Sequence, residues 1–103
     1  MNSNSIRFSP GVLLATRGAT ALLMRAGVSA SSLLRRHLSG DWGDIDPEDQ
    51  ATNEQSLERG LRLLSAYNLE VPFPDTPRTF REVIWIITEA DRSATTILLP
   101  EEY

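Results

Sequence analysis

The sequence predicts a single small α+β domain in which three helices precede a sheet of antiparallel strands. Its 103 residues, 41% of them apolar and 23% charged, are typical of one globular domain. Apolar residues recur at helical spacing between residues 17 and 60, and β-branched and aromatic runs follow from residue 61. We expect the order β-α-α-α-β-β-β over residues 10–103, with the helices packed on one face of an antiparallel meander sheet. Residues 1–9 are polar and are expected to be disordered or frayed.

A short strand and a first helix are expected at the start of this domain. The apolar run at residues 12–16 predicts a buried strand. Thr16 can cap a helix over residues 17–26, because its hydroxyl can accept a hydrogen bond from an amide of the first turn. The apolar residues of this helix share one face: Ala19, Leu22, Leu23 and Ala26. Gly27 then stands where a left-handed residue ends a helix.

Two further helices are predicted from their capping residues. Ser29 is the N-cap of the second helix, which Gly40 stops and whose inward residues are expected to be Leu33, Leu34 and either His37 or Leu38. The third helix starts with Asp46 as N-cap and Pro47 in the first position, and it ends at Gly60. Its apolar stripe is thin and consists of Ala51 and Leu57. We therefore expect this helix to lie on the surface.

Three strands are expected after the helices. Residues 61–67 alternate in part, residues 83–88 are apolar on both faces and suit a central strand, and residues 94–99 form the last strand before Pro100. Residues 89–93 form the turn between the last two strands. The side chains expected to pair across that hairpin are Trp85, Ile87, Ile97 and Leu99.

The segment at residues 68–81 differs from its neighbours because it contains three prolines. Proline removes donors from a strand ladder, so this segment is interpreted as a proline-rich loop insertion or an edge excursion. Phe73 and Phe80 lie within it. Two interpretations stay open: the phenylalanines form a partner-binding patch, or they fold back over the core.

The charge of the chain changes abruptly at Asp41. Residues 1–40 carry five arginines and no acid, whereas residues 41–103 carry five arginines and all fourteen acids. The net charge of −4 argues against direct nucleic-acid binding by the whole chain, because nucleic acids are also negatively charged. The chain has no cysteine, which excludes disulfides, thiol catalysis and zinc–thiolate sites. No segment has the length and apolar content of a membrane span, so a cytoplasmic location without cofactor or membrane partner is expected.

The segment around that junction contains the first candidate site. His37 is the only histidine, and one interpretation makes it a general base that Asp41 or Asp44 orients. The other interpretation is structural: the histidine lies at a helix C-terminus and fixes the turn by bonding a backbone carbonyl or Asp41. Asp41, Trp42 and Asp44 are candidate binding residues, although Trp42 also suits a core anchor. The aspartates of this segment do not have the spacing of a calcium loop, so no metal site is predicted.

The turn at residues 89–93 contains the second candidate site. Asp91 and Arg92 are candidate binding residues, because loops at strand ends often carry binding groups. The alternative is that Asp91 bonds only the amides of its own turn. For an enzyme, His37 would act with Arg92, Glu89 or Tyr67 across a cleft, as in a small toxin-like ribonuclease or another hydrolase.

Several segments are distinctive as sequence motifs, above all the turn Gly40-Asp41-Trp42-Gly43-Asp44 and residues 84–103. Together with other short matches they resemble a family of small bacterial proteins carried by plasmids, integrative elements and phages. Members are called plasmid-related proteins or, from their gene neighbourhood, type I restriction endonuclease subunit M. The other matching positions are residues 13–16, Gly18, Ala19, Arg36, His37, Asn53 and residues 62–67.

The resemblance implies a mobile-element setting and no particular reaction. A methyltransferase does not fit, because the chain has neither its length nor a Gly-rich cofactor loop. Family members join the strand at residues 62–67 to the next through a tight Asp-Gly hairpin, so the longer segment at residues 68–81 puts simple pairing of these strands in doubt.

The function expected from these observations is non-enzymatic binding of a macromolecule. The partner would be a host protein or one encoded by the element, in a counter-defence or element-maintenance role. A homodimer through a sheet edge is also open, at residues 12–16 or 94–99.

Overall fold

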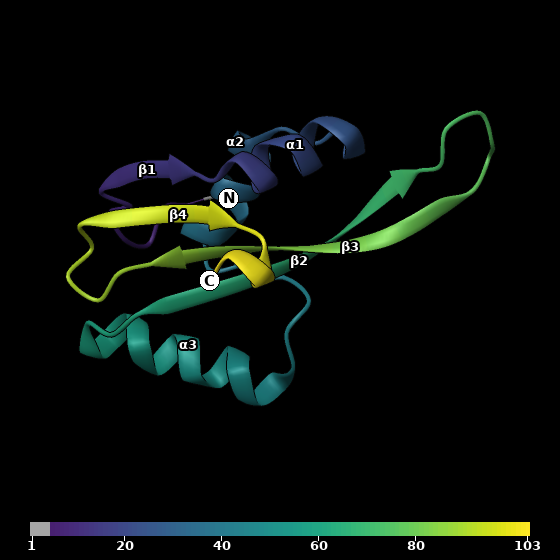
Figure 1. Cartoon of the computed structure of the whole chain (residues 1–103). Helices are drawn as coiled ribbons and strands as arrows, with labels where there is room; N and C mark the ends of the chain where they lie inside the picture. The colour runs from purple at the N-terminus through teal and green to yellow at the C-terminus, as the bar shows by residue number, and fades with distance from the viewer. Residues whose placement is uncertain (1–4) are drawn as a thin grey trace.

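Within residues 5–103, four strands form one sheet in the spatial order β1-β4-β3-β2, and three helices pack against it (Figure 1). The computed structural model describes residues 5–103. The predicted α+β class and element order are confirmed. The elements are β1 (Val12–Ala15), α1 (Arg17–Ala26), α2 (Ala30–Leu38), α3 (Pro47–Arg59), β2 (Leu63–Pro72), β3 (Thr79–Thr88), β4 (Ala94–Leu98) and the 3-10 turn η1 (Pro100–Glu102).

The helices begin at the predicted N-caps, and α1 and α3 end at the predicted glycines, whereas α2 ends at Leu38 with Ser39 rather than Gly40 as its C-cap. Thr16 and Ser29 have extended backbones, and their hydroxyls accept hydrogen bonds from the amides of the first turns of α1 and α2. Asp46 does the same for α3, and Gly27 and Gly60 end α1 and α3 in the left-handed conformation. Local sequence therefore determined the helix boundaries.

Strands β2, β3 and β4 form the expected antiparallel meander, whereas β1 joins the far side of β4 and runs parallel to it. The cross-strand register differs from the expected one. Trp85 pairs with Leu98, and Ile86 pairs with Ile97. Ile97 therefore faces the helices together with Ile86, while Trp85 lies on the opposite face of the sheet.

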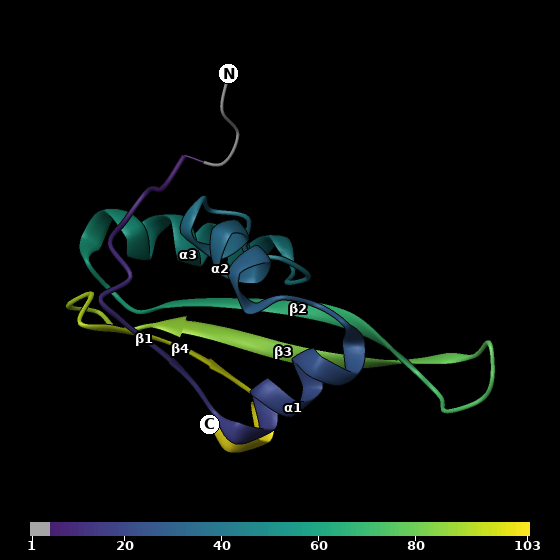
Figure 2. The same cartoon turned by 90° about the horizontal axis from the view of Figure 1, so that it is seen from above.

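The segment at residues 68–81 is mostly strand, which corrects the expected loop insertion. β2 and β3 pair along their whole length from Leu63–Thr88 to Pro72–Thr79, and only residues 73–78 connect them. Pro72 is tolerated because the position at the end of β2 points its missing N–H away from β3. The resulting hairpin projects well beyond the helices, and it accounts for a domain measuring 47 × 27 × 26 Å (Figures 1 and 2).

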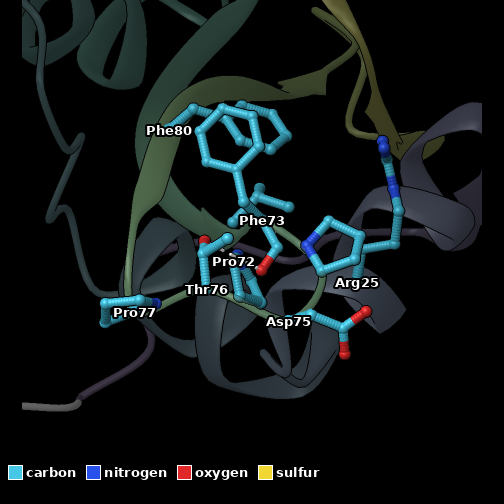
Figure 3. A pocket seen from close by; sticks show the side chains of 9 residues that line it. Arg25, Pro72, Phe73, Asp75, Thr76, Pro77 and Phe80 are labelled. Carbon is cyan, nitrogen blue, oxygen red and sulfur yellow. Dashed lines mark hydrogen bonds between the residues drawn. The ribbon is translucent and has the colours of Figure 1, made fainter.

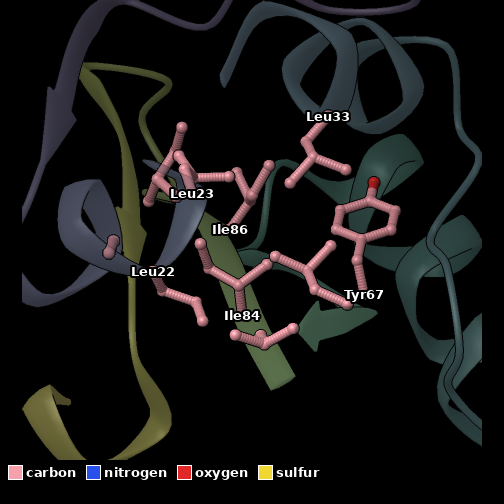
Figure 4. Close-up of a cluster of buried hydrophobic side chains, with 10 residues drawn as sticks. Leu22, Leu23, Leu33, Tyr67, Ile84 and Ile86 are labelled. Atoms are coloured by element: carbon pink, nitrogen blue, oxygen red, sulfur yellow. The ribbon is translucent and has the colours of Figure 1, made fainter. Parts of the chain in front are cut away.

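The main core lies between the sheet and the first two helices. Side chains from α1 and α2 pack on those of β2, β3 and β4 that point to this face (Figure 4). The members labelled in Figure 4 are Leu22, Leu23, Leu33, Tyr67, Ile84 and Ile86. None of the helices within residues 5–103 is long and apolar enough to cross a membrane.

Helix α3 lies along the outer edge of β2 and buries polar side chains (Figure 1). Asn53 and Ser56 are buried, whereas Ala51 is exposed and Leu57 is only partly covered. The expected apolar stripe of Ala51 and Leu57 is therefore wrong. The helix docks on a strand edge, where backbone groups need polar partners.

The described part of the N-terminal segment is packed, which corrects the expectation of a frayed segment for residues 5–9. The Arg7 amide donates to the Leu38 carbonyl at 2.8 Å, and the Arg7 guanidinium pairs with Glu54 at 2.9 Å. The Phe8 ring stacks on Trp42 with a centroid distance of 6.2 Å. The same expectation for residues 1–4 falls outside the described residues.

Candidate functional site

His37 is fully buried at the centre of a chain of hydrogen bonds. Its Nδ1 lies 2.6 Å from the Ser65 hydroxyl, and its Nε2 lies 2.8 Å from the Thr88 hydroxyl. Thr88 in turn lies 2.7 Å from the Thr95 hydroxyl, which donates to the Pro10 carbonyl at 2.8 Å. We call this series the His37 chain. It ties helix α2 to strands β2, β3 and β4 and to the segment that enters β1.

The directions of these bonds determine the tautomer of His37. The Pro10 carbonyl can only accept, so the Thr95 hydroxyl gives its proton there and accepts from Thr88. The Thr88 hydroxyl must then accept from Nε2–H of His37, which leaves Nδ1 to accept from Ser65. The ring is neutral in this arrangement. Burial and, to a smaller extent, the positive charge of Arg92 together lower the pKa of His37 to about 4.

Trp42 is part of the same buried cluster, with only 4% of its surface exposed. Its ring meets the His37 ring edge to face at 5.7 Å and stacks on Phe8. Its indole N–H donates to the Glu54 carboxylate on α3 at 2.9 Å. The structure thus places Trp42 as a core anchor, and a partner cannot reach its ring without unpacking the cluster.

Asp41 stabilises the loop that contains it. Its carboxylate accepts two hydrogen bonds from Arg36, at 2.7 and 3.3 Å, and one from the Gly43 amide at 3.2 Å. The bond from Arg36 is the main reason that the pKa of Asp41 lies below its usual range. The Tyr67 hydroxyl donates to the Asp41 carbonyl at 2.7 Å. Asp41 is half-exposed, but its carboxylate already has a cationic partner.

Asp44 lies against the outer edge of β2. Its amide donates to the Ala66 carbonyl at 2.6 Å, and its carboxylate accepts from the Asn68 amide at 2.9 Å. The Ala66 amide donates to the Trp42 carbonyl at 3.2 Å, so the backbone of Gly43 forms a parallel bridge with Ala66. The predicted binding loop therefore acts as a short extra strand that covers this edge.

Arg92 binds carbonyl oxygens at the end of α3. Its guanidinium donates to the carbonyls of Leu61 at 2.7 Å and Ser56 at 3.2 Å, and also to two carbonyls of its own turn. Asp91 accepts from the Ser93 amide at 2.9 Å, as in the turn-stabilising alternative. Asp91 is exposed, so its carboxylate remains accessible.

The residues of the enzymatic alternative do not form an open site. Both ring nitrogens of His37 are engaged inside the protein, and the Arg92 guanidinium is held by backbone carbonyls. Tyr67 is fully buried, and burial raises the pKa of its hydroxyl. Within residues 5–103, His, Asp and Glu side chains form no group of three that could hold a metal ion.

A hollow lies at the end of the long hairpin. We define the hairpin tip as residues 72–80. It borders a groove of about 820 Å³, which Arg25 at the end of α1 flanks on the side away from Pro77 (Figure 3). The rings of Phe73 and Phe80 lie 4.9 Å apart in this groove. Phe73 is 44% exposed, whereas Phe80 is half-buried against the core. Phe80 therefore folds back over the core, whereas the Phe73 ring stays open to solvent.

Internal bonds hold the hairpin tip in one shape. The Phe73 amide donates to the Arg78 carbonyl at 2.9 Å, and the Arg78 amide donates to the Thr76 hydroxyl at 3.2 Å. Asp75 adopts the left-handed conformation with φ 60°, which aspartate tolerates. The three prolines of the tip restrict the backbone further: Pro72, Pro74 and Pro77. The clustering of proline with phenylalanine was the sequence signal for this site.

Comparisons of this chain with protein-family models, with curated proteins and with solved structures found no match. Function is therefore inferred from the residues and their contacts. Of the predicted binding residues, Trp42 is internal, Asp44 and Arg92 bond to backbone, and Asp41 is paired with Arg36. Sequence reasoning missed Arg25, since only the fold brings the end of α1 beside the hairpin tip.

Proposed function

We propose that this protein is a non-enzymatic binding module that recognises a protein partner through the hairpin tip. The observation that carries this proposal is the projection of a braced, partly apolar tip beyond the folded body (Figures 1 and 3). An exposed aromatic side chain beside a groove is the type of anchor that dominates many protein interfaces. Phe73 would be that anchor, and Phe80 would support it from below.

The rigidity of the tip supports a binding role. A flexible loop loses conformational entropy when it binds, and this loss weakens affinity. Prolines and the hydrogen bonds of Phe73, Thr76 and Arg78 restrict the tip before any partner arrives. The groove also carries opposite charges, Arg25 and Asp75, which would orient a partner without repelling it by net charge.

Catalysis by His37 is less well supported than binding. A general base must reach the proton that it removes, and His37 lies in the core with both ring nitrogens bonded. The resemblance to plasmid-related proteins suggests the biological setting. We therefore propose a host protein or an element-encoded protein as the partner, in counter-defence or element maintenance.

The test uses a photo-reactive amino acid, p-benzoylphenylalanine, incorporated in place of Phe73 in cells of a bacterial host. The matched control carries it in place of Leu61, which is 49% exposed and lies away from the tip. We expect a discrete crosslinked protein from position 73 only. Excess wild-type protein should abolish this crosslink by competing for the partner, whereas excess Phe73→Ser protein should not. Equal crosslinking from both positions, or none from position 73, would overturn the proposal.

A further inference from the structure

The two edge strands of the sheet, β2 and β1, differ in whether their outward backbone groups have hydrogen-bond partners. At the β2 edge, the outward backbone groups of Leu64 are bonded by the Asn53 side chain, and those of Ala66 by the loop at residues 42–44. The Asn68 amide is bonded by Asp44. Further out, the edge carries the charge of Glu70 and then Pro72, and both discourage strand addition. This edge is closed to another strand.

The β1 edge is open and apolar. The amides of Val12 and Thr16 donate to β4, at the Ser93 and Ile97 carbonyls. Because backbone groups alternate along a strand, those of Leu13 and Ala15 point outward. The side chains along this edge are large and apolar, yet more than half of the surface of each is exposed: 62% for Val12, 54% for Leu13 and 51% for Leu14. No described element covers it, and β1 carries no charged residue.

We propose that a second copy of this chain pairs with β1 in antiparallel orientation, with the two-fold axis at Leu14. Each Leu13 then lies opposite Ala15 of the second copy, and each such pair exchanges its two backbone hydrogen bonds. All the outward groups of β1 are satisfied in this register. The four-stranded sheet continues without interruption into that of the second copy.

The side chains along β1 are complementary to themselves in this register. Leu13 shares a face with Thr95, its register partner, so it faces the helix side, where it would meet the small Ala15 of the second copy. On the opposite face, the two copies of Leu14 meet at the axis, where opposed residues approach closely. An uncharged strand brings no like charges together at this axis.

Charge complementarity at the ends of β1 favours a second copy over another partner. Arg17, the exposed first residue of α1, follows directly after the end of β1, so this register brings it near Gly11 at the start of β1 in the second copy. Gly11 lies beside the turn that carries the exposed Asp91, since the Val12 amide bonds to Ser93. The arginine of each copy therefore approaches an aspartate of the other. The assembly also stops at two copies. The two β1 edges pair with each other, and the β2 edge of each copy stays covered, so no free edge remains for a third copy.

The proposed dimer places the hairpin tips at opposite ends. β1 is parallel to β4, and both run toward the tip end of the antiparallel hairpin. Antiparallel pairing of β1 therefore turns the second tip the other way. This dimer does not depend on the proposed function, since β1 and the tip share no residue.

Disulfide trapping tests the register directly, because the chain has no cysteine of its own. At the axis, the cysteine of a Leu14→Cys variant lies opposite the same cysteine of the second copy, at a distance that suits a disulfide. Met24→Cys is the control, since Met24 is 77% exposed and lies on α1. Under mild oxidation we expect Leu14→Cys to form covalent dimers at least about tenfold faster than the control. Equal rates would overturn the register.

Sedimentation of the full chain tests the dimer itself. The interface is short, so we expect a dissociation constant in the micromolar range for the wild type. Leu13→Pro removes only an outward N–H, and Leu14→Glu brings two carboxylates together at the axis. Each should raise the dissociation constant at least about tenfold, while Met24→Glu should leave it unchanged. Urea unfolding verifies that each variant is folded. A wild type that stays monomeric at about millimolar concentration would overturn the proposal.

Discussion

Asn53 on α3 pairs with the backbone of Leu64 on β2 through both ends of its carboxamide. Its Nδ2 donates to the Leu64 carbonyl at 2.7 Å, and its Oδ1 accepts from the Leu64 amide at 3.1 Å. A side-chain amide has the same donor and acceptor geometry as a peptide group, so Asn53 takes the place of a neighbouring strand. This pair explains how a helix with a polar inner face docks on a sheet edge.

Replacement of Asn53 should destabilise the fold. Asn53→Ala leaves a partly buried N–H and C=O of Leu64 without partners, so we expect a loss of about 2–3 kcal/mol in the free energy of unfolding. Asn53→Asp should lose at least as much, because it places a carboxylate against the Leu64 carbonyl. Urea unfolding measures both. The control Gln55→Ala, on the exposed side of α3, should change the free energy by less than about 0.5 kcal/mol. A similar effect at both positions would contradict the role of Asn53.

Protonation of His37 should make stability depend on pH between 6.5 and 4. The unfolded chain binds a proton to His37 near its ordinary pKa of 6.5, whereas the native state resists it until about pH 4. The unfolded state therefore gains protons first as pH falls, and stability falls with it. The whole shift corresponds to a loss of about 3 kcal/mol.

The measurement is urea unfolding at several pH values, with His37→Gln as the comparison. The variant has no other histidine, so its stability should stay nearly flat over the same window. Paired carboxylates such as Asp41 contribute mainly at lower pH, because their pKa values lie below the usual range. Parallel pH profiles for the variant and the wild type would show that His37 does not titrate as described.

Two left-handed glycines should respond differently to alanine. Gly43 has φ 83°, and a Cβ there would overlap the Ala66 carbonyl oxygen and the Tyr67 ring. Gly27 has φ 68°, and a Cβ there would meet no atom within 4 Å. Gly27→Ala should therefore cost only the backbone strain, about 1 kcal/mol, and Gly43→Ala at least about 3 kcal/mol.

Thermal and urea unfolding measure this pair of variants. Gly43→Ala should also expose the Trp42 cluster, which a red shift of tryptophan fluorescence would report. Equal losses of stability for the two variants would mean that the loop at residues 42–44 is not pressed against β2.

The candidate site was predictable in part. The proline and phenylalanine cluster at residues 68–81 marks this segment as unusual in the sequence, but proline predicts loop, and so it hides the strand content of the segment. An outward edge position of β2 tolerates Pro72, and no local pattern identifies such a position. In the turn, Asp91 and Arg92 were recognised as polar groups at a strand end. Only the fold showed that Arg92 bonds the carbonyls of Ser56 and Leu61.

The sequence by itself determined where the three helices begin, where α1 and α3 end, and which fold class the chain adopts. Caps such as Thr16, Asp46 and Gly60 act on amides and carbonyls within a few residues, so local sequence suffices. Tertiary structure alone decided that His37 and Trp42 are internal, that β1 lies beside β4, and that one sheet edge is covered while the other is open. These outcomes depend on contacts between residues far apart in the chain, which neither composition nor periodicity encodes.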